Sequence, residues 1–119
     1  MAQKDVLGEW GERVAGEFLE ANGYTVLDRR WRTTRGEIDI VARCGSTIAF
    51  VEVKTRRTER FGHPLESVTP AKLAKIRSLA GEWCLAHEHR ASSVRIDAIG
   101  IIGDGVHIDS LDHRIAVIA

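Results

Sequence analysis

Charged side chains inside two apolar runs most strongly constrain how this chain can fold. The stretch GEIDIVARCGSTIAFVEVKTR, residues 36–56, places Glu37, Asp39, Glu52 and Lys54 among isoleucine, valine and phenylalanine residues. β-Branched and aromatic residues at this density favour strands, and the short glycine-containing link between the runs predicts an antiparallel hairpin. A sheet that buries such charges is strongly destabilised unless they are paired or bound to a metal.

The alternation of side chains along a strand limits which of these charges can share a surface. In the second run, Glu52 and Lys54 lie on the same face. In the first run, we expect Ile38 and Ile40 to share one face and Asp39 to lie on the other. Antiparallel pairing can therefore bring Asp39, Glu52 and Lys54 to one surface, although the sequence leaves the register of the pairing open.

Two arrangements would make these charges tolerable. In the first, Lys54 pairs with one carboxylate and the other acid is left without a partner. In the second, Asp39 and Glu52 bind a hard divalent cation such as Mg²⁺, which prefers oxygen ligands and keeps several waters. The cation would lower the pKa of a bound water, and Lys54 would orient that water or stabilise charge on a phosphate.

The rest of the sequence predicts one α/β domain over residues 1–119. Asp5 and the pair Thr69-Pro70 are start signals for helices that run to about residues 22 and 87. Besides the hairpin, the expected strands are 24–32, 94–102, 106–111 and 114–119. The predicted architecture is a central mixed sheet flanked by helices, in the order α-β-β-β-α-β-β-β.

The first predicted helix carries a face of small residues beside its apolar stripe. Gly8, Gly11 and Ala15 recur at helical spacing, which predicts that this face approaches other backbone closely. Glu12 lies at the edge of the same face, so its carboxylate is not clearly directed into solvent.

The composition is that of an ordinary globular domain, with 44% hydrophobic and 29% charged residues and a formal net charge of +0. Cys44 and Cys84 lie far apart without Cys-x-x-Cys spacing, which argues against a disulfide framework or zinc knuckle and favours a reducing cytosol. The N-terminus does not read as a signal peptide. No apolar run approaches the ~20 residues that cross a bilayer, so we expect no membrane partner.

Neutrality of the whole chain hides a basic segment. Residues 29–60 contain nine lysines and arginines against four acids. Such a segment can present a basic face to a polyanion, or it can protect strand edges from aggregation. The charge count alone does not decide between the two. The basic residues are Arg29, Arg30, Arg32, Arg35, Arg43, Lys54, Arg56, Arg57 and Arg60.

Six short motifs follow one another along the chain. They are Gly8-x-x-Gly11-Glu12-x-x-Ala15, Gly36-Glu37-Ile38-Asp39, Phe50-Val51-Glu52-Val53-Lys54-Thr55-Arg56, Phe61-Gly62, Lys72 and Arg95-Ile96-Asp97. In this order they resemble the YraN-like bacterial family. Members of that family are described as endonucleases of the PD-(D/E)XK superfamily, similar in core fold to archaeal Holliday junction resolvases. Ile38 stands where the superfamily's name has a proline.

The resemblance implies a restriction-endonuclease-like core and a specific site. Asp39 and Glu52 would bind Mg²⁺ or Mn²⁺, with the Val53 carbonyl as a third ligand. Lys54 would be the catalytic lysine, and Glu12 would reach the site through water or metal.

The basic residues around these motifs are the expected nucleic-acid contacts. Lys72 lies near the start of the second helix, where anions are favoured. Glu37 and Asp97 are secondary candidates, for which a contact with a nearby arginine or backbone group is the preferred interpretation. The predicted contact residues are Arg35, Arg56, Arg57, Arg60 and Lys72.

These observations predict a metal-dependent endonuclease that hydrolyses DNA phosphodiester bonds, with branched or flapped DNA as a candidate substrate. The first alternative is a nucleic-acid-binding domain of the same fold without catalytic activity. The second is a structural or interaction protein whose hairpin charges form an ion-pair network. The sequence leaves a homodimer open, because junction-cutting relatives usually form pairs.

Overall fold

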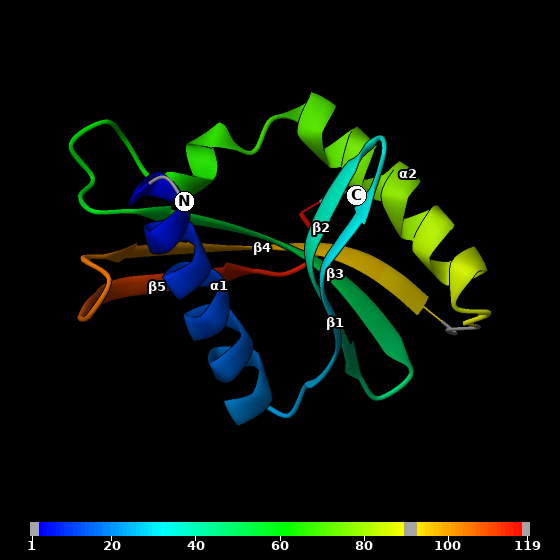
Figure 1. Cartoon of the computed structure of the whole chain (residues 1–119). Helices are drawn as coiled ribbons and strands as arrows, with labels where there is room; N and C mark the ends of the chain where they lie inside the picture. The colour runs from blue at the N-terminus through cyan, green and yellow to red at the C-terminus, as the bar shows by residue number, and fades with distance from the viewer. Residues whose placement is uncertain (1–2, 90–92, 118–119) are drawn as a thin grey trace.

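A five-stranded mixed sheet with a helix on each face forms the body of the protein (Figure 1). The computed structural model describes residues 3–89 and 93–117. This architecture confirms the predicted α/β class. The elements in chain order are α1 (Gln3–Ala21), β1 (Thr25–Thr33), β2 (Gly36–Cys44), β3 (Thr47–Arg56), the short 3₁₀ helix η1 (Pro64–Ser67), α2 (Pro70–Ala86), β4 (Ser93–Gly103) and β5 (Ile108–Arg114).

The strands lie side by side in their sequence order, β1-β2-β3-β4-β5. Three neighbouring pairs are antiparallel, including the predicted β2–β3 hairpin, and β3 pairs with β4 in parallel. A parallel pair needs a crossover connection, and the segment that contains η1 and α2 provides it.

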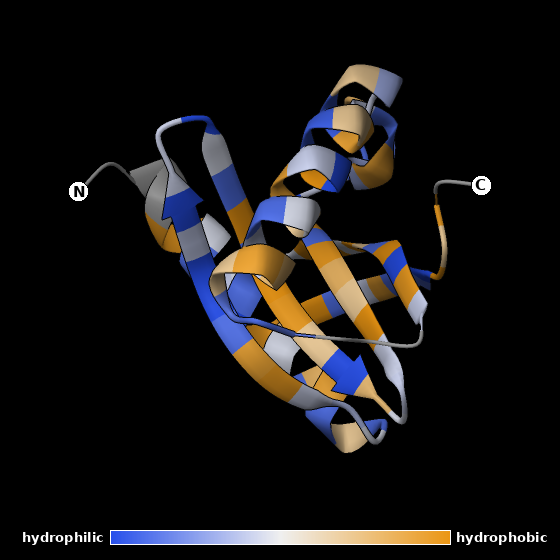
Figure 2. Cartoon of the chain, turned by 90° about the vertical axis from the view of Figure 1, so that its right-hand side faces the viewer, coloured by the Kyte–Doolittle hydropathy of each residue, from blue (hydrophilic) through white to orange (hydrophobic). Residues whose placement is uncertain are grey.

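The sheet separates two apolar clusters. On one face, Trp10, Val14 and Leu19 of α1 pack against strand residues that include Ile40 and Val51. On the other face, α2 packs against Ile38, Val41, Ile48, Phe50 and Ile96, and Figure 2 shows the apolar strands behind this helix. In the described ranges, no helix combines the length and apolar character needed to span a membrane.

The small face of α1 makes the predicted close approach at Gly11. A Cβ atom added to Gly11 would lie 1.8 Å from the Oγ1 atom of Thr55 on β3. Ala15 is fully buried. At Gly8, by contrast, an added Cβ would meet no atom within 4 Å. Close packing therefore explains Gly11 but not Gly8.

The helix boundaries agree with the sequence at α2 and differ at α1. The Thr69 side chain caps α2 by accepting a hydrogen bond from the Lys72 N–H at 3.2 Å, with Pro70 in the first turn. Helix α1 already includes Gln3 and Lys4, so Asp5 is not its N-cap.

The strand expected over 114–119 is not present in its described part. Strand β5 ends at Arg114, and Ala116 has a left-handed φ of 55°, which interrupts an extended strand. The N–H of Ala116 donates to Asp97 and that of Val117 to the Ile96 carbonyl. The chain after β5 therefore continues beside β4, but without a regular ladder. Residues 118–119 lie outside the described residues.

Asp97 is the fully buried acceptor that holds this end of the fold together. It accepts hydrogen bonds from Arg95 at 3.0 Å, from His113 Nε2 at 2.9 Å and from the Ala116 N–H at 3.0 Å. The contact with Arg95 confirms the structural interpretation of this residue. Burial by itself would raise the pKa of Asp97, but the hydrogen bonds from His113, Arg95 and Ala116 lower it below the ordinary value.

We predict opposite effects of the same substitution at two glycines of α1. Gly11→Ala should lower the free energy of unfolding by about 1–3 kcal/mol, because its Cβ overlaps Thr55. Gly8→Ala should raise it by up to about 1 kcal/mol, because alanine favours a helix and nothing lies in its way. Urea unfolding of the two variants measures both effects. Equal effects would contradict the packing described for Gly11.

We further predict that Asp97→Asn destabilises the protein in a pH-dependent way. The lowered pKa of Asp97 means that its stabilising effect is complete above the unfolded value of about 3.9 and is lost as pH falls through the folded pKa. At pH 7 the loss should be about 3 kcal/mol, since the substitution breaks a buried charged pair. Urea unfolding from pH 7 to pH 3 should show the two proteins converging. If the difference in free energy of unfolding stayed constant over this pH range, the ionised Asp97 would not be the source of the stability.

Candidate functional site

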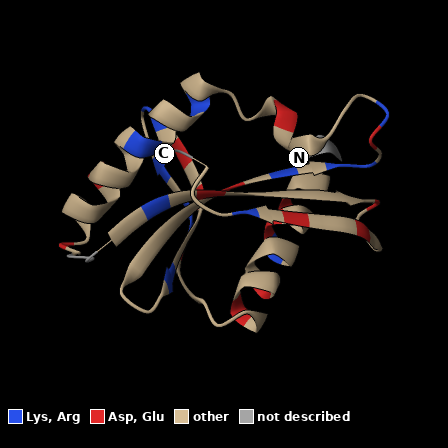
Figure 3. Cartoon of the chain, turned by 180° about the vertical axis from the view of Figure 1, so that it is seen from behind, with Lys and Arg blue, Asp and Glu red and all other residues tan. Residues whose placement is uncertain are grey.

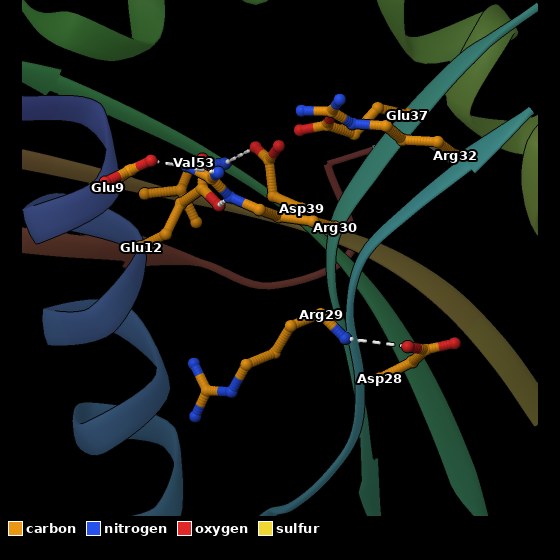
Figure 4. A network of polar contacts seen from close by, with 9 residues as sticks. All are labelled: Glu9, Glu12, Asp28, Arg29, Arg30, Arg32, Glu37, Asp39 and Val53. Carbon is orange, nitrogen blue, oxygen red and sulfur yellow. Dashed lines mark hydrogen bonds and ion pairs between the residues drawn. The ribbon is translucent and has the colours of Figure 1, made fainter. Parts of the chain in front are cut away.

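Three carboxylates from two elements converge beside the sheet. Glu12 comes from α1, and Glu37 and Asp39 come from β2. One oxygen atom from each lies within 4.8 Å of the others. Figure 4 shows Glu12 and Asp39 near Val53 and Arg30, with Glu37 farther along β2. Helix α1 can bring Glu12 this close because Gly11, the preceding residue, lets the helix approach β3.

The pairing of β2 with β3 stops next to Asp39. The regular ladder between β2 and β3 ends at the pair Ile40–Val51. One pair further on, Asp39 and Glu52 occupy opposing positions. The register that the sequence left open therefore brings these two acids together. Here the N–H of Val53 donates to Asp39 Oδ2 at 2.8 Å (Figure 4). A side-chain carboxylate thus takes a hydrogen bond that a backbone carbonyl accepts elsewhere in a ladder.

This opening corrects one expectation about β2. Ile38 packs in the cluster beneath α2, whereas Ile40 packs in the cluster beneath α1, so the two isoleucines do not share a face. The alternation rule assumes a regular strand. It fails here because β2 no longer pairs with β3 beyond Ile40.

Asp39 is poorly suited to carry a charge in the metal-free protein. The residue is only 9% exposed. Burial, followed by the hydrogen bond with Glu52 and the repulsion from that carboxylate, raises the pKa of Asp39 to about 10, although the Val53 N–H acts in the opposite direction. Burial also raises the pKa of Glu12, against the lowering effect of Arg30. A divalent cation would compensate this clustered negative charge, and oxygen donors are the ligands that Mg²⁺ prefers.

Arg30 is a residue of this site that sequence reasoning missed. Its Nε donates to Glu12 Oε1 at 2.9 Å, and its Nη1 lies 3.3 Å from Glu9 Oε1 (Figure 4). It lies between the pairs Arg29–Ile40 and Trp31–Ile38, opposite Asp39. Its backbone has a left-handed φ of 49° inside β1, a conformation that costs about 1–2 kcal/mol outside glycine. Nothing in the run of arginines 29, 30 and 32 shows which one turns toward the acids.

Lys54 lines a large cleft on the described surface. The cleft has a volume of about 510 Å³. Within the described part of the chain, Lys54 forms no ion pair, while Arg30 pairs with Glu12 and Arg32 pairs with Glu37 at 2.6 Å. The predicted pairing of Lys54 with a carboxylate is therefore not found there. The cleft is lined by Leu7, Gly8, Glu12, Val53, Lys54, Thr55, Arg56 and Arg57.

Glu12 also borders a second, smaller cleft. That cleft has a volume of about 360 Å³ and includes Asp39, Arg30 and Glu9 in its wall. The acid of α1 therefore lies between Lys54 on one side and Asp39 on the other.

The predicted nucleic-acid contacts divide into two groups. Arg56 and Arg57 line the large cleft, and Arg60 is exposed on the loop that follows them. Arg35 instead pairs with Glu82 of α2 at 3.2 Å. Lys72 is exposed in the first turn of α2. Neither Arg35 nor Lys72 lines the clefts beside Lys54 and Asp39.

Comparison of the sequence with known proteins identifies the family of the chain. The model of "Uncharacterised protein family UPF0102" matches residues 11–101. The chain belongs to this family. A UPF0102 protein of Leifsonia xyli is 52% identical over 102 residues, which are 86% of each chain. One from Paenarthrobacter aurescens is 46% identical over 113 residues, 95% of this chain and 93% of its own. The predicted YraN-like family is confirmed, whereas nuclease activity stays a prediction.

We predict that Asp39→Asn makes the metal-free protein more stable. Because the raised pKa of Asp39 means that folding favours its protonated form, stability is lost as pH rises from about 4 toward about 10. A neutral amide avoids this loss and can still accept from the Val53 N–H. At pH 8 the gain should be about 1–2 kcal/mol, measured by urea unfolding.

The exposed Asp109→Asn variant is the control and should leave stability unchanged. Mn²⁺ should raise the melting temperature of the wild type and of Asp109→Asn but not that of Asp39→Asn. A destabilised Asp39→Asn protein, or one that Mn²⁺ stabilises like the wild type, would contradict the reading of this site.

Proposed function

We propose that this protein is a metal-dependent endonuclease that hydrolyses phosphodiester bonds in DNA. The observation that carries the proposal is the position of Lys54, which pairs with no acid among the described residues and shares a cleft with Glu12. Glu12 also borders the smaller cleft that contains the buried Asp39. Folding alone does not require acids to gather around the buried Asp39, since burial of a charged group is costly.

Asp39 and Glu52 would hold Mg²⁺ or Mn²⁺, with the Val53 carbonyl and the neighbouring Glu12 and Glu37 as further oxygen donors. When bound, the cation would activate a water and neutralise charge on the phosphate. Asp39 is the predicted ligand that belongs to the group of carboxylates within 4.8 Å of one another, together with Glu12 and Glu37. Glu52 is not in that group, but it forms a side-chain hydrogen bond with Asp39.

The protein's own side chains have separate tasks in this proposal. The Val53 N–H fixes the orientation of Asp39, and Arg30 holds Glu12 at the border of the two clefts. The Lys54 ammonium would stabilise the negative charge that grows on the phosphate in the transition state. Arg56 and Arg57 would bind neighbouring backbone phosphates from the same cleft.

A nucleic-acid-binding domain without catalysis is the second candidate function. The basic wall of the cleft would serve it equally well. It does not account for Asp39, because a binding surface needs no buried carboxylate whose pKa is raised so far. This difference favours the endonuclease.

The test is cleavage of labelled single-stranded, duplex, flapped and four-way-junction DNA in Mg²⁺ or Mn²⁺. We predict that the wild type cuts at least one of these substrates and that chelation of the metal stops it. Glu52→Gln and Lys54→Met should each lower the rate by about 100-fold or more. Glu17→Gln, an exposed position on α1, is the matched control and should cut at the wild-type rate.

Two results would contradict the endonuclease. Cleavage that survives in both site variants would point to a contaminating nuclease. DNA binding without cleavage of any substrate would leave the binding domain as the function.

A further inference from the structure

Among the described residues, Phe61 belongs to neither apolar cluster and lines neither of the two clefts of the candidate site. Its side chain is 91% exposed, more than any other large apolar side chain among the described residues. It stands on the loop that joins β3 to η1. Exposure of a whole phenyl ring to water is unfavourable, so folding by itself gives no reason for an aromatic residue here.

The loop holds Phe61 in a defined position. The Gly62 N–H donates to the Glu59 carbonyl at 2.9 Å, which makes Arg60 and Phe61 the middle residues of a closed turn. Thr58 Oγ1 accepts from the Arg60 N–H at 3.2 Å. Gly62 has a φ of +100°, and a Cβ there would lie 2.1 Å from Glu66 Oε2. The turn therefore presents the Arg60 and Phe61 side chains outward together.

This turn continues directly from the basic wall of the large cleft. Arg56 and Arg57 line the cleft at the end of β3, and Arg57 Nη1 donates to the Asp104 carbonyl at 3.1 Å. Figures 1 and 3 show the loop projecting beyond the sheet near the N-terminal end of α1. An exposed aromatic ring thus stands beyond a row of arginines that leads from Lys54.

We infer that Phe61 stacks on an unpaired base of the nucleic acid whose backbone lies in the cleft, an inference that rests on the proposed function. Single-stranded nucleic acid offers both chemistries that this loop presents, phosphates for the arginines and a flat apolar base for the ring. Bases inside a duplex are already stacked and are not available in this way. The preferred substrate is therefore DNA with an unpaired segment next to the scissile bond, such as a flap or an open branch.

The test compares the binding of an unpaired strand with that of a duplex. Fluorescence anisotropy in Mg²⁺ measures the affinity for a labelled single strand, a flapped duplex and a blunt duplex, with every protein carrying Glu52→Gln to prevent cutting. Phe61→Ala should weaken binding to the single strand and the flap by about 5- to 100-fold and to the blunt duplex by less than about 2-fold. Phe61→Trp should retain the affinity.

The matched control is Leu85→Ala, an 82% exposed apolar residue on α2, which should leave all affinities unchanged. Salt dependence separates stacking from charge. Phe61→Ala should keep the salt dependence of single-strand binding, whereas Arg60→Ala should lower its slope by about 0.7.

If Phe61→Ala weakens binding to the single strand and to the duplex equally, or weakens neither, the stacking role is overturned. The endonuclease still stands in that case if the wild type cuts DNA. The same variant is also tested for binding to vesicles of anionic lipid. If Phe61→Ala weakens binding to these vesicles but not to DNA, the stacking role is overturned and the loop is identified as a membrane contact. A wild-type protein that neither binds nor cuts nucleic acid overturns the inference and the proposed function together.

Discussion

The hydrogen bond from the Val53 N–H to the Asp39 carboxylate is the contact on which the site depends. At this point the ladder between β2 and β3 has ended, and a side chain replaces the backbone acceptor. The exchange buries Asp39 without leaving an N–H group unsatisfied. The carboxylates of Glu12 and Glu37 lie beside Asp39 at this point. The position at which the ladder of the hairpin ends is thus also the position at which the acids gather.

The remaining architecture holds this opening in a fixed shape. Gly11 lets α1 lie against Thr55 of β3, so that the next residue, Glu12, reaches the acids. Arg30 adopts a left-handed backbone within β1 and partly compensates the charge of Glu12. On the next strand beyond β3, Asp97 lies opposite Val51 and ties the chain after β5 onto β4. Rigid elements on several sides restrain side chains that a loop would leave free to move.

The site is held at a cost in stability. Asp39 is buried with its pKa raised to about 10, and Arg30 occupies a strained conformation. Residues of this kind gather where a protein gives up stability for binding or chemistry. Asp39→Asn is predicted to gain stability and to lose metal binding, because the same buried carboxylate destabilises the fold and would bind the metal.

Much of this protein follows from local pattern in the sequence. Strand propensity and turn residues predicted the β2–β3 hairpin, Thr69 and Pro70 predicted the start of α2, and the spacing of Gly11 and Ala15 predicted the close contact of α1. These features depend on neighbours in the chain. The acids of the hairpin were also visible, because charge is conspicuous among apolar residues.

Only the tertiary structure decided how these pieces meet. It selected the register that sets Asp39 opposite Glu52, ended the ladder at Ile40 and turned Arg30 toward Glu12. It also ended the last strand at Arg114, since Ala116 takes a left-handed φ and its N–H donates to the Asp97 side chain. Each outcome depends on atoms far apart in sequence whose competition for hydrogen bonds is settled only when the chain is folded.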